Sequence, residues 1–116
     1  MNELATKSCV PCEGGIDPMP LKDAKKLLSK LQDWKLVGGK AIRQELVIRD
    51  FPAAIEFIHA VAQEAESEGH HPDLHLTGYR RLAIELSTHA IGGLSMNDFI
   101  LAAKIDALPR HLKEAK

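Results

Sequence analysis

The chain has 116 residues, of which 45% are hydrophobic and 27% charged, and its formal net charge is -1 at pH 7. This length fits one compact domain, and the composition is that of an ordinary globular protein. The near-neutral charge provides no basic field, and the aromatic residues, 4% of the chain, are scattered. We therefore expect no direct contact with nucleic acid or with a membrane surface.

The first twenty residues lack the positive-then-apolar pattern of a signal peptide, and no apolar run approaches the roughly 18 residues that span a bilayer. These features favour a cytoplasmic protein. Cys9 and Cys12 have CxxC spacing, but a zinc ribbon needs a second such pair, and a thioredoxin-type motif needs a preceding strand. Residues 1–19 therefore predict a flexible leader with two reduced thiols, and residues 20–116 predict the folded domain.

The first half of the domain predicts a helix followed by a hairpin. The helix has apolar residues at helical spacing, namely Leu21, Ala24, Leu27, Leu28 and Leu31. Residues 34–37 and 40–49 predict two strands joined by a turn at Gly38 and Gly39, with Ile42, Leu46 and Ile48 on one face. Gln44 falls on the same face and argues against full burial near the hairpin end.

The second helix is expected after Asp50, a suitable cap, with Pro52 in the first turn. We expect one continuous apolar stripe made of Phe51, Ala54, Ile55, Ile58, Val61, Ala62 and Ala65. A second hairpin follows, because residues 74–79 and 82–87 alternate with period two. Ser95 and Asp98 then predict a capping box that opens a third helix.

His70 and His71 stand between Gly69 and Pro72, at the junction of the second helix and the third strand. Proline restricts the preceding residue to extended backbone, and glycine accepts the left-handed conformation that ends a helix. Histidine, with an unperturbed pKa of about 6.5, exchanges protons near neutrality. This pair is therefore a candidate for proton-transfer chemistry.

Two acidic residues and three other histidines allow alternative interpretations. Glu66, about one turn before His70, is either a solvated side chain or one that orients an imidazole. Asp98 either caps its own helix or belongs to the site. His89 is either a plain loop residue or a member of the site, whereas His59 and His75 are expected to be structural or exposed histidines outside the site.

Taken together, Glu66, the run His70-His71-Pro72, Tyr79, His89 and Asp98 resemble, in order and spacing, the signature of the pterin-4a-carbinolamine dehydratases. The resemblance covers residues 21–108 and includes the phrases Ser87-Thr88-His89 and Gly93-Leu94-Ser95. It implies an α+β fold of two layers, with a four-stranded antiparallel sheet and three helices on one face. Periodicity independently supports this fold.

The resemblance also implies a function: dehydration of a 4a-hydroxytetrahydropterin to the quinonoid dihydropterin, in recycling of the pterin oxidised by aromatic amino-acid hydroxylases. It implies His70, His71 and His89 as catalytic residues and Glu66 and Asp98 as residues that orient or tune them. Gly69, Pro72, Ser87 and Thr88 would bind the pterin beside the histidines. No metal or cofactor is implied, and family members form homodimers or homotetramers.

One departure is Leu74, where many family members carry a tryptophan. Two other functions remain open on the residues. One is a metal site built from His70, His71, His75 and His89, with or without Cys9 and Cys12, although adjacent residues before a proline project apart. The other is a non-enzymatic binding module, since some animal members of the family bind a homeodomain transcription factor and stabilise its dimer.

Overall fold

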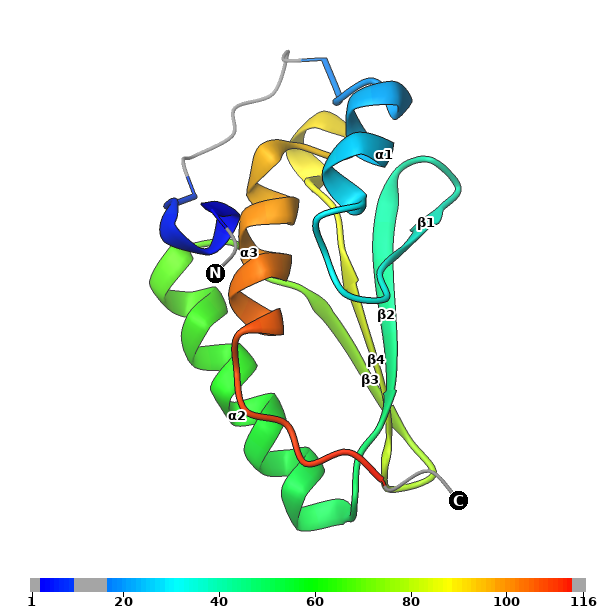
Figure 1. The fold of residues 1–116 in the computed structure, drawn as a ribbon, viewed down its shortest axis with the longest axis vertical. Helices are drawn as coiled ribbons and strands as arrows, with labels where there is room; N and C mark the ends of the chain where they lie inside the picture. Colours follow the sequence, from blue (N-terminus) through cyan, green and yellow to red (C-terminus); the bar gives the residue numbers. More distant parts are fainter. Residues whose placement is uncertain (1–2, 10–16, 114–116) are drawn as a thin grey trace.

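The computed structural model describes residues 3–9 and 17–113, and within them three α-helices lie on one side of a four-stranded sheet (Figure 1). The strands are β1 (Lys35–Val37), β2 (Ala41–Val47), β3 (Asp73–Thr77) and β4 (Arg81–Leu86). The helices are α1 (Leu21–Leu28), α2 (Phe51–Glu68) and α3 (Met96–Asp106), with two short 3₁₀ turns, η1 (Glu3–Thr6) and η2 (His89–Ile91). The two-layer α+β fold expected from the sequence is confirmed.

The sheet has the order β1-β2-β4-β3, and every neighbouring pair is antiparallel. Because side chains alternate along a strand, β2 and β4 present one face to the helices and the other away from them. The start of β3 pairs with the end of β4, where Asp73 lies opposite Glu85. This register brings residues 70–72 beside residues 87–89, although the two segments are far apart in the chain.

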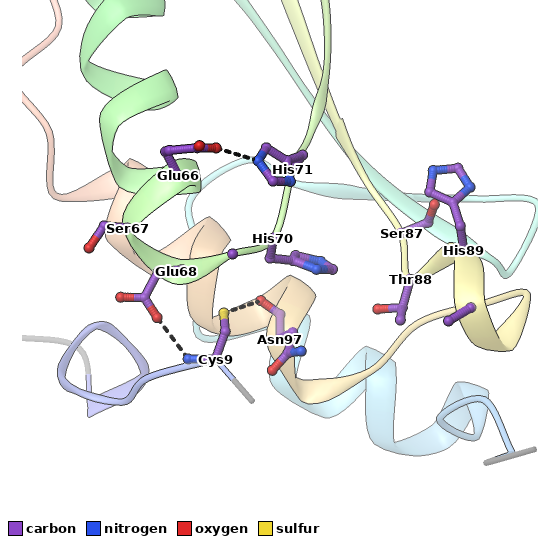
Figure 2. A pocket seen from close by; sticks show the side chains of 12 residues that line it. Cys9, Glu66, Ser67, Glu68, His70, His71, Ser87, Thr88, His89 and Asn97 are labelled. Atoms are coloured by element: carbon purple, nitrogen blue, oxygen red, sulfur yellow. Dashed lines mark hydrogen bonds and ion pairs between the residues drawn. The ribbon is translucent and has the colours of Figure 1, made fainter. Parts of the chain in front are cut away.

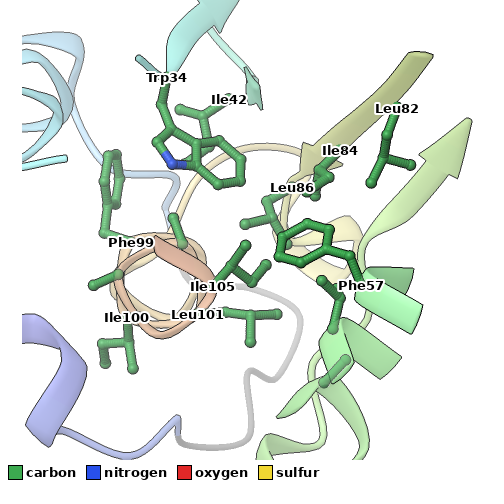
Figure 3. Close-up of a cluster of buried hydrophobic side chains, with 14 of the residues drawn as sticks. Trp34, Ile42, Phe57, Leu82, Ile84, Leu86, Phe99, Ile100, Leu101 and Ile105 are labelled. Carbon is green, nitrogen blue, oxygen red and sulfur yellow. The ribbon is translucent and has the colours of Figure 1, made fainter. Parts of the chain in front are cut away.

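The core lies between the sheet and the helices (Figure 3). Ile42, Ile84 and Leu86 from the sheet meet Phe57 of α2 and Leu101 of α3, and all five side chains are buried. Burial of each such side chain stabilises the fold by roughly 1.5–3 kcal/mol. Over residues 3–9 and 17–113, no helix is both long and apolar enough to cross a membrane.

Both ends of α2 form as the sequence predicts. The Asp50 carboxylate accepts a hydrogen bond from the Ala53 N–H at 2.9 Å, and a proline lies in the first turn. At the other end Gly69 takes the left-handed conformation with φ 66°. A side chain at that position would be strained, so the glycine sets where α2 stops.

The apolar stripe predicted for α2 is partly wrong. Phe51 and Ile55 are 49% and 46% exposed, whereas Ala53 and Phe57 are buried. The buried face is rotated towards positions 53, 54, 57, 61 and 65. Three of these residues are alanines, whose small side chains let α2 pack closely against α3. The exposed apolar residues therefore form a second face that the single chain does not cover.

Three smaller expectations also differ. α1 ends at Leu28 rather than at Leu31, and β2 ends at Val47, with Ile48 forming an isolated bridge to Leu112. Gln44 is fully buried, which the sequence argued against. Its amide nitrogen donates to the Gln32 carbonyl at 2.6 Å and its oxygen accepts from Arg110 at 3.2 Å, so its polar atoms are paired.

The segment before α1 also differs from a purely flexible leader. Residues 3–9 pack against α3, with Leu4 buried in the core cluster. Residues 17–19 lie against the loop before α3, where the Met19 N–H donates to the Leu94 carbonyl at 2.8 Å. Cys12 lies outside the described residues, and the domain boundary at residue 20 stays a prediction.

Candidate active site

A cavity of about 580 Å³ opens between the end of α2, the end of β4 with η2, and the start of α3 (Figure 2). A cavity of this size holds a small organic molecule. The lining includes seven of the residues predicted for the site, namely Glu66, Gly69, His70, His71, Ser87, Thr88 and His89. Pro72 directly follows this lining, and Asp98 lies behind it. The structure therefore brings together the two chain segments that sequence analysis selected.

His70 and His71 point in different directions. The His70 N–H bonds to the Ala65 carbonyl at 3.2 Å, just past the left-handed Gly69. Successive side chains of extended backbone project to opposite sides, so one imidazole turns inward and the other outward. The His70 side chain is 12% exposed and that of His71 is 65% exposed. The two histidines thus offer the cavity one fixed ring and one exposed ring.

Asp98 holds the inward histidine. His70 Nε2 lies 2.6 Å from Asp98 Oδ1, and the carboxylate is fully buried. The other carboxylate oxygen accepts from Thr88 Oγ1 at 2.9 Å and from the Ser95 N–H at 3.0 Å. The capping box is also present. Both interpretations of Asp98 therefore describe real contacts of one side chain.

This contact determines which His70 nitrogen is available for chemistry. An ionised carboxylate only accepts hydrogen bonds, so the ring nitrogen that faces Asp98 carries a hydrogen. Nδ1 is then the ring nitrogen that does not face Asp98. The buried carboxylate thus fixes the orientation of the His70 ring at the cavity wall.

Glu66 contacts His71 and not His70. Its Oε1 lies 2.7 Å from His71 Nε2, and both side chains are mostly exposed. Solvent screens such a pair, so its effect on stability is small. The pair orients the His71 ring, and both side chains belong to the cavity lining (Figure 2).

His89 approaches from across the cavity. It begins η2 and follows Ser87 and Thr88, which continue from β4 (Figure 2). The Thr88 N–H donates to the Gly93 carbonyl at 2.8 Å, and Gly92 is left-handed with φ 67°. These contacts close the loop tightly on itself. His89 is therefore exposed at a defined place opposite the end of α2.

Sequence analysis missed five lining residues: Cys9, Ser67, Glu68, Ala90 and Asn97. The Cys9 N–H donates to Glu68 Oε1 at 2.7 Å, and Cys9 Sγ donates to the Asn97 carbonyl at 3.6 Å. Burial, with the nearby Glu68 carboxylate, raises the pKa of the Cys9 thiol to about 12. Cys9 and Glu68 are 59 positions apart, and no local pattern joins them.

Of the four histidines of the alternative metal site, His70, His71 and His89 line the cavity, whereas His75 is exposed on β3 and does not. His59, expected outside the site, is exposed on α2 and does not line the cavity either. Among the described residues, no group of three or more His, Cys, Asp or Glu side chains is placed to hold a metal ion.

The family model described as pterin 4 alpha carbinolamine dehydratase matches residues 17–108. A Nitrosospira multiformis protein, provisionally named a pterin-4-alpha-carbinolamine dehydratase, is 44% identical over 108 residues, which cover 93% of this chain and 94% of that protein. The Arabidopsis thaliana protein named pterin-4-alpha-carbinolamine dehydratase 2, mitochondrial, is 46% identical over 110 residues, which cover 91% of this chain and 59% of the plant protein.

Solved structures show the same fold. The crystal structure of a transcriptional coactivator/pterin dehydratase from Brucella melitensis matches with a TM-score of 0.73 and 29% identity, covering 78% of this chain and 97% of that one. A pterin dehydratase-like protein, described as a RuBisCO assembly factor in the alpha-carboxysome, matches with a TM-score of 0.55 and 19% identity, covering 66% and 88%. The second likeness concerns the fold alone.

Proposed function

Because the chain belongs to the pterin 4 alpha carbinolamine dehydratase family, we propose that it is a hydro-lyase that removes the 4a-hydroxyl group of a 4a-hydroxytetrahydropterin as water. The family predicted from the sequence is confirmed. The observation that carries the proposal is the pairing of His70 with the fully buried Asp98 at the wall of a cavity that His89 reaches from the opposite side. The product is the quinonoid dihydropterin.

The reaction needs one proton donor and one proton acceptor. The C4a–O bond breaks when the oxygen receives a proton and leaves as water, and a base removes the proton from the ring nitrogen that becomes part of the new double bond. We assign His70 as the acid, because the Asp98 carboxylate holds its ring in a fixed orientation at the cavity wall. His89, which lies across the cavity, is the base, and His71 binds the leaving hydroxyl.

The remaining parts of the proposal concern binding and context. Gly69, Pro72, Ser87 and Thr88 bind the pterin ring beside the histidines. Leu74 stands where many family members carry a tryptophan, and it packs against the core opposite Ile84. If an aromatic side chain covers the pterin in this protein, another residue has to provide it. We assign the protein to pterin recycling in the cytoplasm, and subcellular fractionation checks the compartment.

A dehydration assay tests this function directly. The purified protein, stripped with a chelator, is mixed with 4a-hydroxytetrahydrobiopterin, and formation of the quinonoid product is followed by absorbance. We expect acceleration without added metal or nucleotide. Loss of activity on chelation would favour the metal site instead. No acceleration at all, in a folded protein, would favour the non-enzymatic binding module.

We also propose that the protein is a homodimer or homotetramer. Phe51 and Ile55 expose a continuous apolar face on α2, and Val47 is 42% exposed at the end of β2. Exposed apolar faces and open strand edges are usually covered by a partner. Light scattering at micromolar concentration should give a multiple of 12.8 kDa. A strictly monomeric mass would contradict this proposal.

A further inference from the structure

We infer that residues 3–9 form a wall of the substrate cavity and that Lys104 is the positioning residue that holds this wall in place. The segment thereby sets the affinity for the pterin. This inference rests on the proposed function, but it concerns a part of the chain outside the family match, which begins at residue 17. It is carried by contacts at both ends of the segment.

The segment is folded rather than extended. Residues Glu3–Thr6 form η1, in which Thr6 Oγ1 donates to the Glu3 carbonyl at 2.7 Å, and the Lys7 N–H donates to the Leu4 carbonyl at 3.1 Å. The Leu4 side chain enters the core cluster and is buried against the helices. The turn therefore has a hydrophobic anchor, which fixes it against α3.

A polar clasp adds to this anchor. Lys104 Nζ donates to the Ala5 carbonyl at 3.0 Å and lies 3.6 Å from Glu68 Oε2. The other oxygen of Glu68 accepts from the Cys9 N–H at 2.7 Å (Figure 2). Both charged side chains are largely buried, so solvent screens the pair less than it screens a surface pair. One lysine on α3 and one glutamate on α2 thus hold the middle and the end of the segment.

The clasp places Cys9 at the cavity. Cys9 lines it together with Glu68, His70 and Asn97, and Figure 2 shows it on the side of His70 next to α3. With a pKa of about 12, the thiol is neutral at physiological pH and is a poor nucleophile. Its role is therefore that of a contact surface, which closes the side of the cavity that α2, η2 and α3 leave open.

Lys104 allows a clean test, because it holds the segment and does not line the cavity. We expect Lys104→Met, made in the full chain, to raise KM for 4a-hydroxytetrahydrobiopterin about tenfold, the effect of losing one strong contact. The Kd of 7,8-dihydrobiopterin, a stable pterin without the 4a-hydroxyl, should rise equally by calorimetry. The value of kcat should stay within about twofold. Lys22→Met, at an exposed position of α1, is the matched control and should change neither constant.

A second variant reaches the same segment from its apolar side. Leu4→Asp should release η1 from the core and weaken pterin binding by a similar factor. If both variants act through the segment, the double variant Leu4→Asp/Lys104→Met binds no more weakly than the worse single variant, since coupled sites are not additive. Melting curves establish that each variant is folded. Additive losses would overturn the inference.

The two readouts separate this inference from the proposed function. Normal turnover with unchanged KM and Kd in both variants would overturn the proposed role of residues 3–9 and leave the dehydratase function standing. Absence of turnover in the unmodified protein, with dihydrobiopterin binding that Lys104→Met weakens, would overturn the dehydratase reaction and support the wall. Failure of the unmodified protein to bind dihydrobiopterin would overturn both.

Discussion

α3 carries an aspartate in its first turn and another in its last turn, and the two carboxylates have different kinds of partner. Asp98 contacts Thr88, Ser95 and His70, which lines the cavity. Asp106 accepts hydrogen bonds from the Trp34 indole at 2.9 Å, from the Gln44 amide at 3.2 Å and from the Gln32 N–H at 3.1 Å, and it pairs with Arg110 at 3.7 Å. None of these last four residues lines the cavity.

The position on the helix explains the difference. The N-terminus of a helix favours a negative charge and presents free N–H groups, so Asp98 is largely compensated through one oxygen. Its other oxygen remains for His70. The C-terminus disfavours a negative charge, so Asp106 requires a cation and three donors. A buried carboxylate at the start of a helix can therefore orient a titrating group, whereas one at the end serves the scaffold.

The largest expected effect is at the histidine that Asp98 holds. His70→Ala should lower turnover by roughly 10²-fold or more, the usual contribution of a positioned proton donor. The fold should be retained, because the ring lies at the cavity and not in the core. Stopped-flow measurement of kcat, with circular dichroism as the check on folding, tests this. A near-normal rate would move the acid to another residue.

Asp98→Asn tests the orienting role itself. The amide keeps one oxygen for the cap, but it no longer provides a negative charge beside His70. We expect a fall in kcat on the order of tenfold, with a loss of stability of about 1 kcal/mol from the weakened cap. Measuring kcat and the free energy of unfolding for the same variant separates the effect on His70 from the effect on the cap. A lower melting temperature with an unchanged rate–pH profile would mean that Asp98 only caps α3.

Asp106→Asn is the matched substitution at the other end. Loss of the charge leaves Arg110 without its ion pair and weakens three hydrogen bonds, so we expect a loss of about 2 kcal/mol in the free energy of unfolding. The rate at saturating substrate should change less than about twofold. Urea unfolding and the dehydration assay give the two values. A rate loss as large as that of Asp98→Asn would remove the distinction between the two ends.

The last prediction concerns stability rather than rate, at the contact between Lys104 of α3 and Glu68 of α2. The hydrogen bond from the Cys9 N–H, followed by the charge of Lys104, holds the pKa of Glu68 below its ordinary value of 4.5. The ionised form is thus favoured by folding, so its stabilisation is complete above pH 4.5 and is lost as the pH falls through the lower, folded value. Glu68→Gln should be less stable than the unmodified protein at pH 7.

The two proteins should converge in stability under more acidic conditions. Urea unfolding of both at pH 7 and near pH 3 checks this, because titration of the other carboxylates cancels in the comparison. A stability difference that is the same at both pH values would show that the Glu68 charge does not hold the segment.

The sequence predicted those features that depend on neighbours in the chain. The cap at Asp50, the helix end at Gly69 and the capping box at Ser95 are local chemistry, and each is present. The element order follows from periodicity in the same way. The gathering of His70 and His89 was implied by family resemblance, and the pairing of β3 with β4 provides its physical reason.

The features that were missed depend on distant contacts. The polarity of Gln44 argues against its burial. The structure buries it because its hydrogen-bond partners, on the loop before β1 and beyond α3, come from distant parts of the chain that no local pattern reveals. Which face of α2 is buried depends on how the helix is rotated about its axis. Alanines occur on more than one face, so the sequence pattern fits more than one rotation. Glu66 lies about one turn before His70 in the sequence, and the pattern left open which imidazole it would contact. In the structure that imidazole is His71, beyond the left-handed Gly69.

The two ends of the described chain lie well apart: the N-terminal segment lies beside α3 and the end of α2, and the C-terminal segment runs to the bottom of the view (Figure 1). Leu112 pairs with Ile48 near the end of β2, away from the cavity, whereas the residues that follow Glu3 pack beside it. An affinity tag or a surface linker attached ahead of residue 3 is therefore joined directly to the segment that borders the pterin cavity and can displace it. Attachment after residue 113 leaves that border free. Immobilised preparations of the two kinds should differ in KM, and the C-terminal form should match the untagged protein.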